Sequence, residues 1–316
     1  MACYRIADRV RWQDRRTRSF LAHHTVVDGK YFYIIAVPNM LHLLIPAVRL
    51  VDQKVRIVFI VNGLSRREIH FLSKVYPHAP LLSLPALPGA SWPHGTVLSL
   101  LLRTSPCDFG ILDHDFFLFD ESIFRQLEFS DNEYAICLTG WRNKATGLYF
   151  PGTHFLYLRV APLRQLIGQY RVDANIYKHL PSSTSSALSS LGLSMSNPPK
   201  EYQNFFDSFL LLSALAMYHR LATRVLKPAG NGFTHVGSTS MGSQLTKPPV
   251  HHYVNARFIA YVEDKDVVKE YLSRGVAPAG NAARFRSLID PATANRIDAL
   301  VARVHRHVSA HRPQSA

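Results

Sequence analysis

The chain has few cysteines and no long apolar run. Its three cysteines, Cys3, Cys107 and Cys137, form no CxxC pair. This spacing indicates neither a disulfide framework nor a zinc cluster, and it fits a reducing cytosol. No stretch approaches the roughly 18 apolar residues of a membrane helix, and the N-terminus begins with charge. We therefore expect neither a membrane span nor a signal peptide.

Acidic residues are also scarce. The 22 Asp and Glu residues face 36 Lys and Arg residues, which gives a formal net charge of +14. This excess favours an anionic partner, which is nucleic acid, a membrane surface or a phosphorylated small molecule. The arginines concentrate in residues 5–18 and 302–312, which predicts solvated or surface-binding tails. We expect a cytoplasmic protein, of bacterial type by its alanine- and arginine-rich tail, with peripheral contact at the inner face of the membrane left open.

The sequence alternates between strand and helix patterns. A hydrophobic content of 47% indicates a globular protein. Residues 30–38 and 54–63, and the part of segment 108–120 that precedes the turn at 113–115, are apolar and rich in β-branched or aromatic side chains, which predicts buried strands. Residues 40–51 and 95–104 have helical patterns between them. This order predicts an α/β fold with a Rossmann-like, mostly parallel central sheet and helices on both faces.

The remaining segments predict smaller elements. Ser65 and Glu68 form a capping box at the start of a helix. Further predictions are an edge strand in residues 80–88, strands at 134–141 and 153–160, a serine-rich lid at 182–199, a buried helix at 205–222 and a glycine-rich loop at 230–242.

Asp113, His114 and Asp115 follow an apolar strand directly. Two carboxylates at a buried strand end are costly unless a cation or hydrogen-bond donors compensate their charge. Ligands collect at the carboxyl ends of parallel strands, and Mg²⁺ and Mn²⁺ bind through one or two carboxylates. We therefore expect Asp115 to bind a metal and Asp113 to face the metal or the nucleotide, with His114 beside the cofactor. A turn cap or an arginine partner would also explain the two acids.

With this DxD motif at residues 113–115, the chain resembles GT-A-fold glycosyltransferases that use nucleotide sugars. The resemblance covers roughly residues 31–242 in the order of the elements. It implies a nucleotide-binding half at 30–130 and an acceptor-binding, catalytic half at 131–262, between a basic lead-in at 1–29 and a helical basic tail at 263–316. The C-terminal part is then an elaboration on the acceptor side.

The resemblance implies roles for four further residues. Asp207 matches the carboxylate that deprotonates the acceptor hydroxyl in inverting members. His235 matches a histidine that supplies a third metal ligand. Gly237 and Ser238 match a segment whose backbone and hydroxyl groups approach the diphosphate. Ordinary alternatives are a first-turn aspartate that interacts with the helix dipole and a surface or core histidine.

Other polar residues stand at strand ends. Asn39 and Asn62 follow the first two strands and are candidates to bind the base or ribose, although turn formation explains both equally well. Trp141 with Arg142, and Thr153 with His154, are expected at the same corner; a core position for Trp141 is the alternative.

The predicted function is metal-dependent transfer of a sugar from a nucleoside-diphosphate sugar to an acceptor hydroxyl. The cofactor is Mn²⁺ or Mg²⁺, and the stereochemical outcome is undecided. A nucleotidyltransferase is the second enzyme class, but its glycine-rich signature is missing after the first strand. A basic protein that binds nucleic acid or membranes is the non-enzymatic alternative; nucleic acid is disfavoured because aromatic and basic residues do not alternate along one face.

Overall fold

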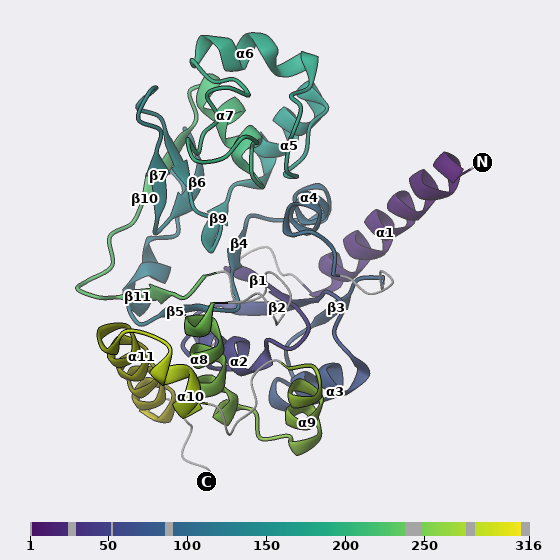
Figure 1. Cartoon of the computed structure of the whole chain (residues 1–316). Helices are drawn as coiled ribbons and strands as arrows, with labels where there is room; N and C mark the ends of the chain where they lie inside the picture. The colour runs from purple at the N-terminus through teal and green to yellow at the C-terminus, as the bar shows by residue number, and fades with distance from the viewer. Residues whose placement is uncertain are drawn as a thin grey trace. The chain divides into compact units, whose positions relative to one another are not determined.

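The structure, a computed structural model, describes residues 2–24, 30–51, 53–85, 91–237, 248–275 and 282–310. Two compact units alternate along the chain, and their elements are labelled in Figure 1. Unit 1 comprises Met1–Tyr33, Trp92–Leu112 and Ser122–Lys227, and unit 2 comprises Ile34–Ser91, Asp113–Glu121 and Pro228–Ala316. The functional halves expected at residues 30–130 and 131–262 remain a prediction.

The central sheet confirms the predicted α/β fold. It has seven strands, is mostly parallel and has the order β10-β6-β9-β4-β1-β2-β3. These strands are β1 (Tyr31–Ala36), β2 (Arg56–Val61), β3 (Leu81–Ser83), β4 (Phe109–Leu112), β6 (Glu133–Cys137), β9 (Phe155–Leu158) and β10 (Ala222–Val225). Strand β9 runs antiparallel to β4 and β6, whereas β10 pairs with β6 and β2 with β3 in parallel.

Burial explains why the strands could be read from the sequence. All six residues of β1 and five of the six residues of β2 are buried. A strand that is covered on both faces requires a continuous apolar run instead of an alternating one. Strand β3 is the edge strand, as the prolines of residues 80–88 predicted.

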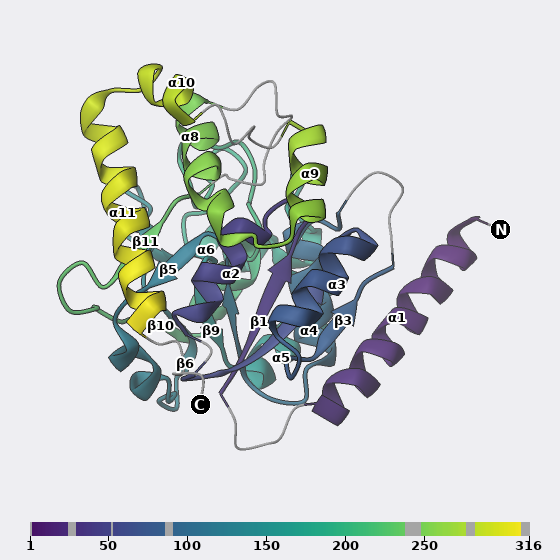
Figure 2. The ribbon, with the colours of Figure 1, turned by 90° about the horizontal axis from the view of Figure 1, so that it is seen from below.

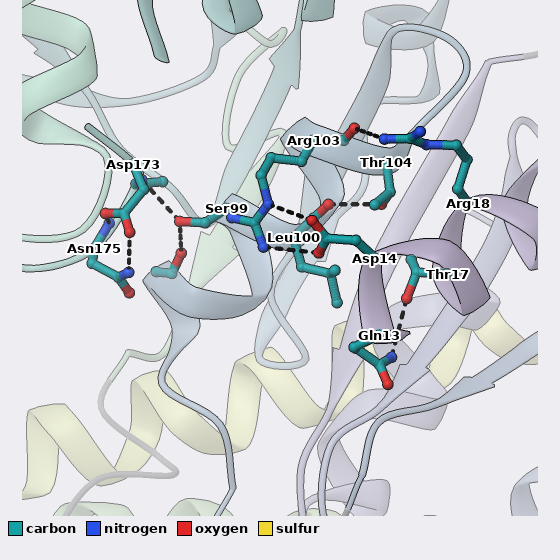
Figure 3. Close-up of polar contacts among 12 residues, drawn as sticks. Gln13, Asp14, Thr17, Arg18, Ser99, Leu100, Arg103, Thr104, Asp173 and Asn175 are labelled. Atoms are coloured by element: carbon teal, nitrogen blue, oxygen red, sulfur yellow. Dashed lines mark hydrogen bonds and ion pairs between the residues drawn. The ribbon is translucent and has the colours of Figure 1, made fainter. Parts of the chain in front are cut away.

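Unit 1 contains one helix at the N-terminus and further helices between residues 94 and 218. They are α1 (Ala2–His24), α4 (His94–Thr104), α5 (Val160–Tyr170), η2 (Ser182–Thr184), α6 (Ser185–Ser190) and α7 (Leu210–Tyr218). The basic N-terminal segment, expected as a solvated tail, is α1, with Gln13, Thr17 and Leu21 buried. The Arg103 guanidinium of α4 donates two 3.0 Å hydrogen bonds to the Asp14 carboxylate (Figure 3). This pair fixes α1 to α4.

Unit 2 has helices from two separate parts of the sequence, residues 41–75 and 249–310. They are α2 (Leu41–Arg49), α3 (Arg66–Val75), α8 (Pro249–Phe258), η4 (Ile259–Tyr261), α9 (Lys265–Ser273), α10 (Ala282–Ser287) and α11 (Pro291–Ala310). Helices α10 and α11 both contact α8 (Figure 2). Among the described residues, no helix has the length and apolar character needed to cross a bilayer.

Short elements complete the fold and correct three predictions. They are the ribbon of β5 (Phe116–Leu118) and β11 (Phe233–His235), the pair of β7 (Gly140–Arg142) and β8 (Tyr149–Pro151), and η1 (Glu121–Gln126). The helix expected at 205–222 is limited to α7, and β10 follows it. The serine-rich segment 182–199 contains η2 and α6, so it is partly helical. The loop expected at 230–242 contains β11, and its residues 238–242 lie outside the described part of the chain.

Candidate metal and donor site

The acidic turn links the end of β4 to β5. The Phe116 N–H donates to the Asp113 carbonyl at 3.2 Å, which closes the turn. Asp115 is 3% exposed and His114 is 9% exposed, whereas 28% of the Asp113 side chain is exposed. The turn therefore holds one carboxyl group in the interior and a second in a partly buried position, as two unequal positions of one site.

The β5–β11 ribbon brings His235 to this turn. His235 pairs with Phe116 across the antiparallel ribbon, and the Val236 N–H donates to the Asp115 carbonyl at 3.2 Å. His235 Nε2 lies 3.4 Å from Asp115 Oδ1 and 4.0 Å from Asp113 Oδ2. Segments that are more than a hundred residues apart in the sequence thus meet at one point in unit 2.

These three side chains have a donor set suited to a divalent cation. One ligand atom from each of Asp113, Asp115 and His235 lies within 4.8 Å of the others. Two carboxylates and an imidazole suit Mn²⁺, while carboxylates alone are the usual Mg²⁺ ligands. The residues present therefore fit the implied metal.

The electrostatics of the cluster disfavour a negative charge on Asp113. Burial and the Asp115 carboxylate raise the pKa of Asp113 to about 7, although His235 opposes them. Burial lowers the pKa of His235, but its hydrogen bond to Asp115 and the charges of both aspartates outweigh this and raise it. A bound cation would relieve the repulsion between the carboxylates.

Gly237 follows the histidine strand in a left-handed conformation, with φ +72°. A Cβ atom at this position would lie 3.5 Å from Cε1 of the His235 ring. Glycine avoids the strain of this backbone conformation. Ser238, expected beside the diphosphate, lies outside the described residues.

Asn39 and Asn62 lie at the carboxyl ends of β1 and β2 in unit 2. Asn62 is 1% exposed; its N–H donates to the Ala36 carbonyl, and its own carbonyl accepts from Ser91 Oγ at 3.0 Å. Asn39 has φ 63°, and its N–H donates to Glu68 Oε1 at 2.6 Å. Asn39 lies in a turn, whereas Asn62 bonds to the last residue of β1. The contact of Asn39 with Glu68 is one that the sequence did not predict.

Asp207 belongs to unit 1. It precedes α7 instead of lying in its first turn, and its Oδ2 lies 2.6 Å from Lys200 Nζ. Burial raises the pKa of Asp207, but the hydrogen bond and charge of Lys200 outweigh burial and lower it. The carboxyl group is therefore ionised at neutral pH. Lys200 is a partner that sequence reasoning missed, because no local pattern relates it to Asp207.

Trp141 joins the same cluster of unit 1. Lys200 Nζ lies 4.4 Å from the centre of the Trp141 ring, which is cation–π geometry. The Trp141 ring also stacks on Phe150, but the residue is only partly buried, so the core position expected for it is not found. Arg142 donates to the Gly147 carbonyl at 2.6 Å, and His154 contacts Thr139 Oγ1.

A mostly parallel α/β sheet followed by a turn with two carboxylates and a histidine agrees with the GT-A resemblance noted in the sequence. The profile of the StrH glycosyltransferase N-terminal domain matches residues 8–163, just under half of the chain. This match supports, for residues 8–163, the glycosyltransferase resemblance noted in the sequence. Among curated proteins, no sequence matches the chain.

Several solved glycosyltransferases show distant similarity. LgtC in complex with donor and acceptor sugar analogues is 10% identical, with 77% of this chain and 99% of that chain covered and a TM-score of 0.45. Residues 1–349 of S. aureus TarS are 12% identical, with 89% and 88% covered and a TM-score of 0.36. The match to an active-site mutant of LgtC is 14% identical with a TM-score of 0.34, and it covers 45% of this chain and 64% of that chain. The assignment rests on the domain match, because similarity at this level adds no detail about the site.

Proposed function

We propose that the protein transfers a sugar from a nucleoside-diphosphate sugar to an acceptor hydroxyl, with Asp113, Asp115 and His235 holding a divalent cation. The observation that carries this proposal is the cluster itself, whose ligand atoms lie within 4.8 Å of one another. The glycosyltransferase domain match supports the reaction class. Mn²⁺ is the preferred cation because imidazole is one of the three ligands.

The residues of the turn have distinct roles in this proposal. When bound, the cation neutralises the charge that develops on the departing nucleoside diphosphate. Asp115 is the inner ligand because it is 3% exposed, and His235 orients toward it at 3.4 Å. Asp113, with 28% of its side chain exposed, faces the side from which the nucleotide arrives. Gly237 lets the backbone approach the diphosphate.

Asp207 is proposed as the base that accepts the proton of the acceptor hydroxyl if the reaction inverts the anomeric centre. Its ion pair with Lys200 at 2.6 Å keeps the carboxylate charged and oriented. A charged carboxylate is the form that accepts a proton. A retaining reaction needs no such base. In that case Asp207 would bind the acceptor instead.

The test of the metal site is thermal stabilisation by UDP, GDP and dTDP, each with and without Mn²⁺. We expect one nucleotide to raise the melting temperature only with Mn²⁺, because a cation held by Asp113, Asp115 and His235 would offset the negative charge of the diphosphate. Asp115→Ala should abolish the shift. Asp266→Ala is the matched control, since that side chain is 69% exposed. The proposal fails if no nucleotide gives a metal-dependent shift, or if Asp115→Ala behaves like the control.

Turnover tests the role of Asp207. The assay uses the sugar donor of the nucleotide that stabilises the protein. Release of nucleoside diphosphate from this donor should be lost in Asp207→Asn, while Mn²⁺-dependent nucleotide binding stays unchanged. Turnover that survives the substitution would remove Asp207 as the base. A pyrophosphate product in place of a nucleoside diphosphate would identify a nucleotidyltransferase.

A further inference from the structure

Asn39 has an unusual backbone conformation just after the carboxyl end of β1. It follows β1 with φ 63°, a left-handed conformation that asparagine tolerates better than most residues. Its Oδ1 is buried and, among the described residues, has no hydrogen-bond partner. A strained backbone and an unsatisfied polar atom at the end of a parallel strand together indicate a place for a ligand.

Glu68 holds the backbone of Asn39 from another element. It is 0% exposed, and its Oε1 accepts from the Asn39 N–H at 2.6 Å. Its Oε2 accepts from the Ser65 N–H at 2.9 Å, which completes the capping box of α3. The capping box needs only one carboxyl oxygen. The second oxygen is therefore available to fix the loop after β1.

Tyr271 of α9 reaches the same carboxyl group. Burial raises the pKa of Tyr271, and its side chain is hydrogen-bonded to Glu68. The neutral hydroxyl donates to Glu68 and accepts from the Leu41 N–H at 3.3 Å. Two buried side chains, Glu68 of α3 and Tyr271 of α9, thus hold the backbone N–H groups of Asn39 and Leu41.

From these contacts we infer that Glu68 and Tyr271 are positioning residues that present the Asn39 side-chain amide to the nucleoside of the donor. This inference rests on the proposed function, because it assumes that a nucleotide binds at the carboxyl edge of the sheet. Neither positioning residue touches the nucleotide. They act by holding the loop in the left-handed conformation that aims the amide, and the amide forms a hydrogen bond with the base or ribose.

Nucleotide affinity with Mn²⁺, measured by calorimetry, tests the inference. Asn39→Gly removes the side chain and keeps the left-handed backbone free of strain. We expect it to weaken binding about tenfold, as the loss of one hydrogen bond does. Glu68→Gln should weaken binding several-fold, because its amide cannot accept from both the Asn39 and Ser65 N–H groups. Tyr271→Phe should do so to a smaller extent, and it provides a second probe if Glu68→Gln folds poorly.

Ser65→Ala is the matched control. It removes the other half of the capping box, where Ser65 Oγ accepts from the Glu68 N–H at 3.3 Å, and leaves the bond from Glu68 to Asn39 in place. It should lower the melting temperature without changing nucleotide affinity. If Ser65→Ala weakens binding as much as Glu68→Gln, the role of Glu68 is only structural and the inference is wrong.

A double-mutant cycle separates positioning from general damage. In the Asn39→Gly background, Glu68→Gln should weaken binding less than twofold further, because its effect passes through Asn39. Additive losses would overturn the inference. Affinity for Mn²⁺ alone should stay unchanged in all these variants. If the wild-type protein binds no nucleotide with Mn²⁺, the proposed function fails; if Asp115→Ala abolishes binding but Asn39→Gly does not alter it, only this inference fails.

Discussion

Replacing Asp113 with asparagine should stabilise the metal-free protein above neutral pH, even though it removes a proposed metal ligand. Burial and the Asp115 carboxylate raise the pKa of Asp113 from 3.8 to about 7. The fold therefore disfavours the charged form of this side chain. Asp113→Asn has nearly the same shape and removes that charge, so it relieves the repulsion in the absence of a cation.

The expected size follows from the geometry of the cluster. A rise in pKa from 3.8 to about 7 corresponds to roughly 4 kcal/mol against the charged form. Because 28% of the Asp113 side chain is exposed, screening reduces this to about 2 kcal/mol. The substitution also loses the attraction to His235 Nε2 at 4.0 Å, which contributes less than about 1 kcal/mol. We expect a net gain of about 1–2 kcal/mol at alkaline pH.

The sign of the pH dependence is fixed by the raised pKa. Between the unfolded value of 3.8 and the folded value of about 7, the folded protein binds more protons at Asp113 than the unfolded chain does. The free energy of unfolding of the wild type therefore falls as pH rises through this interval. The advantage of Asp113→Asn should be absent below it, grow within it and level off above about pH 7.

Urea unfolding with a chelator, from about pH 4.5 to about pH 8, measures this difference. Asp266→Asn is the control, because its side chain is 69% exposed and its removal should change stability by less than about 0.5 kcal/mol. Saturating Mn²⁺ should reverse the order, since only the wild type retains both carboxylate ligands. An Asp113→Asn protein that is no more stable than the wild type at pH 8, or equally stabilised at pH 4.5, would refute the reasoning.

Three further substitutions have expected outcomes. His235→Ala should lower Mn²⁺ affinity at least tenfold by calorimetry, and Mg²⁺ affinity less, because imidazole suits Mn²⁺ better; equal losses would contradict this. Lys200 holds the pKa of Asp207 below its usual range, so this carboxylate adds stability above about pH 4 that is lost as pH falls through its folded pKa. Lys200→Met should therefore destabilise the protein at pH 7, and the difference in urea unfolding should shrink in acid. In Gly110→Ala the new Cβ would overlap the ring of Phe32, which should cost about 1–3 kcal/mol in the same assay; an unchanged midpoint would show that the ring can move.

The strands of the core could be predicted because they are buried on both faces. Strand β2 reads as an almost continuous Val and Ile run, and the structure places it inside the sheet. The turn with Asp113 and Asp115 was equally visible, since it needs only a strand and the residues that follow it. His235 was selected through the family resemblance, and the ribbon that brings it to the turn was not predicted.

Features that depend on distant contacts could not be predicted. The helix expected from residue 205 begins at Leu210 because Phe209 adopts φ 71°, and its N–H donates to the carbonyl of Ala174. Glu68 was recognised as half of a capping box, which is a local pattern. Its bond to Asn39 spans 29 residues, and no spacing rule indicates it.

The register of the β5–β11 ribbon decides whether the cluster exists. His235 and Phe233 pack on the same side of the ribbon, where the Phe116 ring lies 5.2 Å from that of Phe233 and 6.1 Å from the imidazole. Successive side chains of a strand point to opposite faces, so a slip of one residue would put Thr234 where the histidine now faces Asp115. The aromatic pair opposes such a slip, because its stacking is lost when the register changes. The two phenylalanines therefore support the proposed metal site without offering a ligand atom, since they keep the imidazole 3.4 Å from the buried carboxylate.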